Sequence, residues 1–290
     1  MNQPAIPTTW TIRSLLGWST PWLVRRGIES ARLDGELLLA KALGLRRIDL
    51  FLDPDRPMNA LELTAFKALI LRRAVREPVA HILGMREFWG IEFFSSHAAL
   101  IPRPETELLI ETILSHFPDR QTPLKILEPC IGSGAVLCAL LNEYPQAEGM
   151  GSDLSAEALV LARRNVEKCG CTARVMLEEG DLDAMVSSDV RFDVVVVNPP
   201  YIDSRELEEL QPEVRDWEPR LALDGGLDGL TVLQRIPALF KRRLRSGGVG
   251  VTEIGYDQGE AVVELFRRGG FDSVELRVDY HRLPRAVVVY

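Results

Sequence analysis

The spacing of apolar residues changes twice along this 290-residue chain. Between about residues 11 and 76, apolar residues recur at helical spacing, in stretches separated by Gly44 and by the DPDRP segment, which predicts a small helical bundle. Residues 86–94, REFWGIEFF, place aromatic residues around a central glycine and predict a β-hairpin. After Thr122, short apolar runs alternate with amphipathic stretches, which predicts strands alternating with helices.

This alternation predicts an α/β fold, with a doubly wound, mostly parallel seven-stranded sheet, a small N-terminal helical bundle and a β-hairpin connector. We expect the bundle at residues 1–78, the connector at 79–101 and the sheet domain at 102–290. In such a sheet, ligands bind outside the carboxyl ends of the strands. Candidate functional residues are therefore expected where the predicted strands end.

One predicted strand ends in an unusual way. The segment FDVVVVNPPYID begins as a strand buried on both faces and then reaches Asn198, two prolines and Tyr201; we call residues 198–201 the NPPY segment. The prolines make Asn198 and Pro199 extended and rigid. The Asn198 side-chain carbonyl and the Pro199 backbone carbonyl can then accept both N–H bonds of one planar NH2 group, and Tyr201 offers a flat face for packing. The alternative is a strand that simply leaves the sheet through a Pro-Pro turn.

A second candidate lies in LEPCIGSGAVLCALL, where Gly132 and Gly134 form a turn between a buried strand and a helix that starts near Ala135. Such glycines let a cofactor approach the backbone, and a helix N-terminus favours a negative group. Asp153 ends the next strand, 19 residues after Gly134. An acid at about this distance binds ribose hydroxyls in dinucleotide-binding folds, and S-adenosylmethionine also contains a ribose. Asp181, after the third strand, can accept a hydrogen bond from an adenine amino group.

Each of these features also has a simpler interpretation. A Gly-x-Gly turn is common in α/β proteins, and Asp181 can be a solvated loop acid. The sequence after Gly132 lacks the full G-x-G-x-x-G pattern, which disfavours a nicotinamide dehydrogenase. The four cysteines have no metal-finger spacing, so we expect reduced thiols and no metal.

The net charge of −8 disfavours non-specific binding to nucleic acids. The charge is unevenly distributed: residues 1–80 hold 12 basic and 8 acidic residues, a net +4, and the remainder holds 22 and 34, a net −12. The N-terminal part is thus either an ordinary solvated surface or a partner-binding module. With no signal-peptide pattern and no long apolar run, we expect a cytoplasmic protein that does not bind membranes. The oligomeric state is not predicted.

Together, the glycine turn, Asp153 and the NPPY segment resemble the class I S-adenosylmethionine-dependent methyltransferases that carry (Asp/Asn)-Pro-Pro-(Tyr/Phe). A narrower resemblance, to the peptide chain release factor N5-glutamine methyltransferase family, covers nearly the whole chain. It rests on five segments: EPVAHILGMREFWGIEFF, LIPRPETELLIE, NPPYI, VRDWEPRLALDGGLDGL and GYDQGEAV.

The resemblance implies methyl transfer from S-adenosylmethionine, giving S-adenosylhomocysteine, to the glutamine amide of the Gly-Gly-Gln motif in class I release factors. It implies that Asn198, Pro199, Pro200 and Tyr201 bind this glutamine, with Asn198, Pro199 and Tyr201 as catalytic residues. The implied cofactor-binding residues are Cys130, Ile131, Gly132, Ser133, Gly134, Asp153, Asp181, Leu182 and Asn198.

The chain departs from the family pattern at two places. The loop begins with Glu128, Pro129 and Cys130 where members commonly have Asp-x-Gly. Leu182 stands where an aromatic residue often covers the adenine.

Three other functions remain open: N5-glutamine methylation of a ribosomal protein, DNA adenine N6-methylation, and a binding module with an inactive site. A DNA enzyme is expected to carry a basic target-recognition region, whereas this chain is acidic and its extra module is short and helical. The intact NPPY segment and Asp153 argue against an inactive site. We therefore expect a release factor as the partner and no direct contact with nucleic acid.

Overall fold

The computed structural model describes residues 9–184, 186–187 and 189–290. The chain divides into two compact units, Met1–Gly84 and Met85–Tyr290. The boundary between the two units lies within residues 79–101, the range predicted for the connector. Across the described residues, no helix combines the length and the apolar character that a membrane span requires.

The first unit is the predicted helical bundle. Its helices are α1 (Ile12–Val24), α2 (Ala31–Leu43), α3 (Ala60–Ala74) and α4 (Val79–Leu83), with a 3-10 helix η1 (Arg47–Phe51). The Thr11 side chain caps α1 and the Asn59 side chain caps α3. In these two helices, the capping side chain accepts from a backbone N–H of the first turn that has no partner within the helix. Gly44 ends α2 in the left-handed conformation. The apolar faces enclose a core that includes Leu23, Leu38 and Phe66.

The second unit starts with a two-stranded hairpin and continues into a seven-stranded sheet of order β5-β4-β3-β6-β7-β9-β8. Strands β5, β4, β3, β6 and β7 run parallel to one another, whereas β9 is antiparallel to both β7 and β8. The strands are β1 (Met85–Phe88), β2 (Ile91–Phe94), β3 (Lys125–Pro129), β4 (Glu148–Asp153), β5 (Val175–Glu179), β6 (Phe192–Val197), β7 (Leu244–Glu253), β8 (Val274–Val278) and β9 (Pro284–Val289). The predicted α/β fold with a mostly parallel sheet is confirmed.

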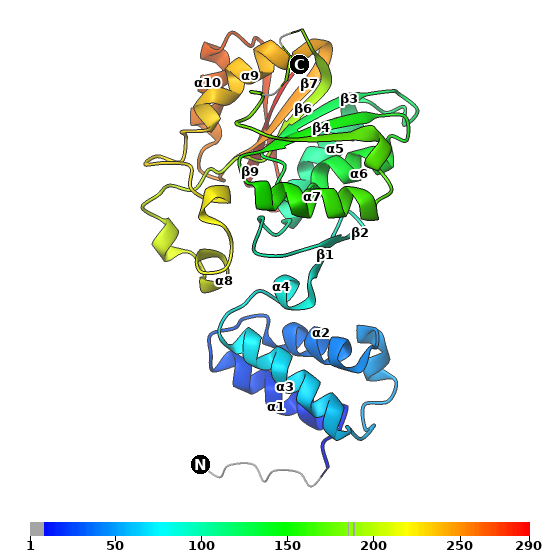
Figure 1. Ribbon diagram of the computed structural model, residues 1–290. Coiled ribbons are helices and arrows are strands. Elements are labelled where there is room, and N and C mark those ends of the chain that lie inside the picture. The colour runs from blue at the N-terminus through cyan, green and yellow to red at the C-terminus, as the bar shows by residue number, and fades with distance from the viewer. Residues whose placement is uncertain (1–8, 185, 188) are drawn as a thin grey trace. The chain divides into compact units, whose positions relative to one another are not determined.

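Helices cover both faces of this sheet, with α5, α6 and α7 on one side and α9 and α10 on the other (Figure 1). The helices are α5 (Glu107–His116), α6 (Ala135–Glu143), α7 (Ala156–Lys168), α8 (Pro212–Arg215), α9 (Ile236–Arg243) and α10 (Gly259–Arg268). Three 3-10 helices matter below: η2 (Pro104–Thr106), η5 (Arg220–Ala222) and η6 (Leu233–Arg235). The 3-10 helix η6 directly precedes α9 in the chain.

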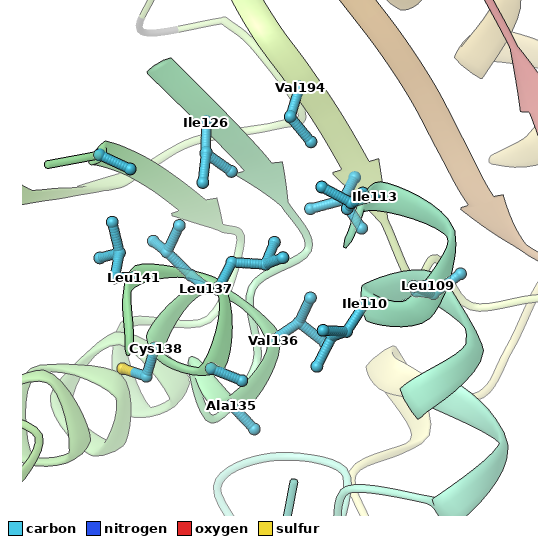
Figure 2. Packing of buried hydrophobic residues seen from close by; sticks show 14 of the residues in the cluster. Leu109, Ile110, Ile113, Ile126, Ala135, Val136, Leu137, Cys138, Leu141 and Val194 are labelled. Atoms are coloured by element: carbon cyan, nitrogen blue, oxygen red, sulfur yellow. The ribbon is translucent and has the colours of Figure 1, made fainter. Parts of the chain in front are cut away.

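Strand β6 has buried side chains on both faces, as its run of valines predicts. Val194 and Val196 belong to the core on the α5 and α6 side, and Val195 and Val197 belong to the core on the other side. Figure 2 shows Val194 and Ile126 facing the apolar side chains of α5 and α6. The NPPY segment therefore leaves the sheet from a strand that packing on both faces holds in place.

Candidate active site

A cavity of about 230 Å³ lies in the second unit, at the carboxyl ends of the parallel strands. The loop before α6, the ends of β4 and β5, the NPPY segment and η5 all contribute to its wall. Nine predicted site residues line the cavity: Cys130, Ile131, Gly132, Ser133, Asp153, Asp181, Leu182, Asn198 and Pro200. Gly134, Pro199 and Tyr201 are not among the lining residues.

The glycine-rich loop turns through a series of left-handed backbone conformations. The φ angles are 56° at Cys130, 54° at Gly132 and 77° at Gly134. Cys130 thus adopts a backbone conformation that glycine adopts most easily, at the position where the family pattern commonly has glycine. Burial and nearby carboxylates, Asp153 first among them, raise the pKa of the Cys130 thiol to about 12. The thiol therefore stays protonated, which makes it a poor nucleophile.

Asp153 links this loop to the start of α7. One carboxylate oxygen accepts from the Gly132 N–H and the other from the Ser155 N–H, each at 2.9 Å. Burial raises the pKa of this carboxyl group, although backbone hydrogen bonds oppose the rise. A carboxylate has about four acceptor positions, so Asp153 can still accept from the hydroxyl groups of a ligand in the cavity.

The end of β5 adds Asp181 and Leu182 to the opposite part of the wall. Arg235 in η6 donates to the Asp181 carboxylate at 2.8 Å, and both residues line the cavity. Leu182 has a φ angle of 53° and is 5% exposed, and its carbonyl accepts from the Ser152 hydroxyl. The sequence patterns did not indicate Arg235, because nothing in them predicts which residue of a distant helical turn faces Asp181.

Glu128 is a buried acid at the end of β3 that also lines the cavity. Its carboxyl accepts from the Leu137 N–H in the first turn of α6 at 2.7 Å. Burial raises the pKa of Glu128 well above its ordinary value, although the Leu137 bond favours the charged form. Glu128 thus ties the strand to the helix that follows the glycine-rich loop. An acid directly after the buried residues Ile126 and Leu127 was the available signal for it.

The NPPY segment is held from two directions. The Asn198 side-chain NH2 donates to the Thr106 hydroxyl at 3.4 Å, which leaves the Asn198 carbonyl oxygen as an acceptor. The Tyr201 hydroxyl donates to the Glu253 carboxylate at 3.1 Å. The Tyr201 backbone carbonyl accepts from Gln258 at 2.8 Å. Thr106 and Glu253 were not predicted as site residues, because their roles depend on how η2 and β7 pack around the segment.

Two segments that contribute to the cavity wall are joined by an ion pair. The Glu218 carboxylate accepts from the Ile101 N–H at 3.0 Å and from Arg103 at 2.5 Å. Residues beside each partner line the cavity, namely Leu100, Pro102, Pro219 and Leu221. This pair therefore holds together two segments that are more than one hundred residues apart in sequence.

The chemistry of the site follows from these positions. The glycine-rich loop and the Asp153 carboxylate line one part of the cavity, and the NPPY segment presents an amide carbonyl to another. Cys130, the cysteine that lines the cavity, keeps its thiol protonated, and no metal cluster of three or more His, Cys, Asp or Glu residues occurs among the described residues. The arrangement is suited to binding a polar NH2 group beside a second bound molecule.

Comparisons with known proteins agree with this arrangement. Residues 14–84 match the PrmC N-terminal domain family, and residues 126–217 match a methyltransferase domain family. Two curated relatives are both described as release factor glutamine methyltransferase. The one from Geobacter sulfurreducens is 43% identical over 281 residues, covering 97% of each chain. The one from Caulobacter vibrioides is 41% identical over 262 residues, covering 90% of each chain.

Solved structures share the fold at much lower identity. The hMettl16 catalytic domain, crystallised with an RNA hairpin, superposes with a TM-score of 0.58 at 16% identity, over 74% of this chain and 80% of that chain. A Pyrococcus furiosus methyltransferase gives a TM-score of 0.51 at 16% identity, over 77% of this chain and 96% of that chain. The structures support the fold alone, whereas the curated relatives match along almost the full length of both chains. The chain belongs to the release factor glutamine methyltransferase family.

Proposed function

We propose that this protein transfers the methyl group of S-adenosylmethionine to the side-chain amide nitrogen of the glutamine in the Gly-Gly-Gln motif of class I release factors. The observation that carries the proposal is the position of Asn198. It follows a buried strand, lines the same cavity as Asp153 and the glycine-rich loop, and presents a free carbonyl oxygen. The relatives named above match both the helical unit and this catalytic unit.

The cavity fits S-adenosylmethionine in its donor and acceptor groups. Asp153 would accept from the ribose hydroxyls, using the lone pairs that Gly132 and Ser155 leave free. Residues 130–134 would hold the methionine part, whose carboxylate the N-terminus of α6 favours. Asp181 and Leu182 would bind the adenine, with Asp181 held in place by Arg235. The product that leaves this part of the site is S-adenosylhomocysteine.

The NPPY segment binds the substrate glutamine. The Asn198 side-chain carbonyl and the Pro199 backbone carbonyl accept the two N–H bonds of the glutamine amide, and Pro200 and Tyr201 shape the adjoining wall. An amide nitrogen is a weak nucleophile because its lone pair is delocalised into the carbonyl. Two fixed acceptors increase its electron density and align it for attack, so positioning and electrostatics provide most of the rate enhancement.

S-adenosylmethionine supplies an electrophilic methyl group on a sulfonium. The glutamine nitrogen forms a bond to this methyl carbon as the carbon–sulfur bond breaks, and the electron pair of that bond stays on sulfur. The nitrogen then loses a proton to water, so no general base is needed before transfer. Asn198 and Pro199 stabilise the positive charge that develops on the nitrogen.

The substrate is proposed to be a whole release factor. The first unit acts as the recognition module, and the protein works in the cytoplasm, where translation takes place. Neither nucleic acid nor membrane takes part in this proposal.

Methyl transfer from labelled S-adenosylmethionine to a purified release factor, a ribosomal protein fraction and DNA, measured side by side, tests this function. We expect label on the release factor alone, located by mass spectrometry on the glutamine of Gly-Gly-Gln. A release factor with that glutamine changed to asparagine is the matched control and should stay unlabelled. Label on ribosomal protein or DNA, with none on the release factor, would overturn the proposal.

A further inference from the structure

Glu253 is a buried acid that the proposed reaction does not use directly. It ends β7, is 2% exposed, and pairs in register with Ala286 of β9. It is not among the residues that line the cavity, and the function proposed above assigns it no contact with the cofactor or the substrate. A carboxyl group in such a place is costly unless it has partners, and its partners are residues of the active site.

The contacts of Glu253 lead to both polar side chains of the NPPY segment. One carboxylate oxygen accepts from the Tyr201 hydroxyl at 3.1 Å. The other has no hydrogen-bond partner in the part of the chain that the structure describes. The Thr106 hydroxyl lies near the same carboxyl and favours its charged form. Thr106 in turn accepts from the Asn198 NH2 group at 3.4 Å.

Charged and titratable groups surround this carboxyl from several elements. Burial raises the pKa of Glu253 to about 7, and the Glu105 carboxylate adds to the rise. The hydroxyls of Thr106 and Tyr201 and the guanidinium of Arg285 oppose it. Burial, followed by Glu253 itself, raises the pKa of Tyr201, whereas Arg285 and Arg103 lower it. Tyr201 therefore stays a hydrogen-bond donor, and Glu253 is the group that titrates near neutral pH.

We propose that Glu253 is a positioning residue whose charged form holds Asn198 and Tyr201 in the orientation that binds the substrate amide. This inference rests on the function proposed above. A charged carboxylate only accepts hydrogen bonds. Tyr201 donates to one of its oxygens, and the nearby Thr106 hydroxyl, although it forms no hydrogen bond with Glu253 in this structure, is attracted to orient its proton toward the unpartnered oxygen. Thr106 then has lone pairs for the Asn198 NH2 group, and the Asn198 carbonyl oxygen faces the cavity.

In the neutral form of Glu253, the directions of these hydrogen bonds are reversed. A protonated carboxyl is also a donor, so it can donate to Thr106, whose proton is then free to point at Asn198. The Asn198 amide turns over to accept it and presents NH2 to the cavity. Two NH2 groups then face each other at the substrate position, and one of the two acceptors for the glutamine is lost.

The test is the pH profile of kcat and kcat/KM for methylation of an intact release factor, with S-adenosylmethionine affinity measured by calorimetry at each pH. For the wild type we expect activity to rise roughly tenfold from one pH unit below to one unit above the ionisation near pH 7. Glu253→Gln should lower kcat at pH 8 by roughly 10- to 100-fold. It should also abolish the rise of activity with pH and leave cofactor affinity unchanged. Glu260→Gln, at an exposed position of α10, is the matched control and should keep the wild-type profile.

Thr106 provides a second test that does not alter the buried carboxyl. Thr106→Val removes the hydroxyl with little change in shape and should lower kcat, whereas Thr106→Ser keeps the hydroxyl and should restore most of the activity. A wild-type profile in Glu253→Gln, or equal kcat in the Val and Ser variants, would overturn the role of Glu253. A wild type that binds S-adenosylmethionine and methylates no release factor at any pH would instead overturn the proposed function.

Discussion

The orientation of the Asn198 side chain depends on one neighbouring hydroxyl. Because its NH2 group donates to Thr106, its carbonyl oxygen is left for a ligand, and the two ends of the amide are no longer equivalent. At the scale of single residues, hydrogen bonds to neighbouring groups thus hold the polar side chains of the site in one orientation. Asp153 is a second example, since its two oxygens accept from different backbone N–H groups.

Asn198→Ala should retain S-adenosylmethionine binding and lose methyl transfer. The variant removes one preorganised acceptor at the charge that develops on nitrogen, a loss that can cost about 10² to 10³ in rate. Asn142→Ala, at an exposed position of α6, is the matched control. Transfer to the release factor at the wild-type rate by Asn198→Ala would show that this residue does not bind the amide.

Asp153→Ala should weaken S-adenosylmethionine binding. A hydrogen bond to a charged partner contributes about 1.5 to 3 kcal/mol, which corresponds to roughly 10- to 100-fold in the dissociation constant. Asp153→Asn keeps one oxygen and should lose less. Calorimetry on the three proteins measures this order, and equal affinities would exclude Asp153 as the ribose ligand.

At the scale of elements, the turn between β3 and α6 shows how packing overrides local preference. Cys130 stays in the left-handed region at φ 56°, although most side chains avoid it at a cost of about 1–2 kcal/mol. Its side chain packs against the core on the α9 side of the sheet. The element therefore combines a strained backbone with a buried side chain.

Cys130→Gly relieves this strain and Cys130→Val increases it, because a β-branched residue is a poor fit to positive φ. We expect Val to lower the midpoint of thermal unfolding relative to Gly, by roughly 2 to 4 °C for each kcal/mol. S-adenosylmethionine affinity should be retained in Cys130→Gly. A Val variant as stable as the Gly variant would show that the backbone conformation at this position carries no strain.

The sequence predicted the strands and turns that form the site, but not the residues from distant segments that contact them. The valine run of β6, the turn at Gly132 and the strand end at Asp153 are local patterns, and the structure has each of them where the pattern placed it. Thr106, Glu253 and Arg235 approach the cavity from segments whose position depends on the packing of the sheet, so no local pattern indicates them. The roles assigned to the predicted site residues remain proposals.

At the scale of the whole molecule, the two units carry opposite charge. The first 80 residues have a net charge of +4 and the remainder −12. A basic module in the same chain as an acidic catalytic unit can steer an acidic protein substrate and raise the rate of encounter. If the first unit recognises the substrate, the kcat/KM for a protein substrate should depend on this unit, whereas that for a small substrate should not.

A short peptide that carries only the Gly-Gly-Gln loop should be a much poorer substrate than the intact release factor, because it lacks the surface that the first unit would bind. The kcat/KM for the intact factor should also fall as salt screens the charges, while that for the peptide changes little. Steady-state kinetics at several salt concentrations measure both. Equal kcat/KM for peptide and intact factor would exclude a docking role.

The position of β9 has a consequence for the order in which the sheet can form. This strand, Pro284–Val289, follows β8 in the chain, yet it lies inside the sheet between β7 and β8. Its residue Ala286 pairs with Glu253, and the Ile254 N–H donates to the Arg285 carbonyl. Without β9, the edge of β7 that carries Glu253 has no partner strand, and β8 is not joined to the sheet. Completion of the sheet beside the NPPY segment is therefore coupled to the insertion of β9 between these two strands.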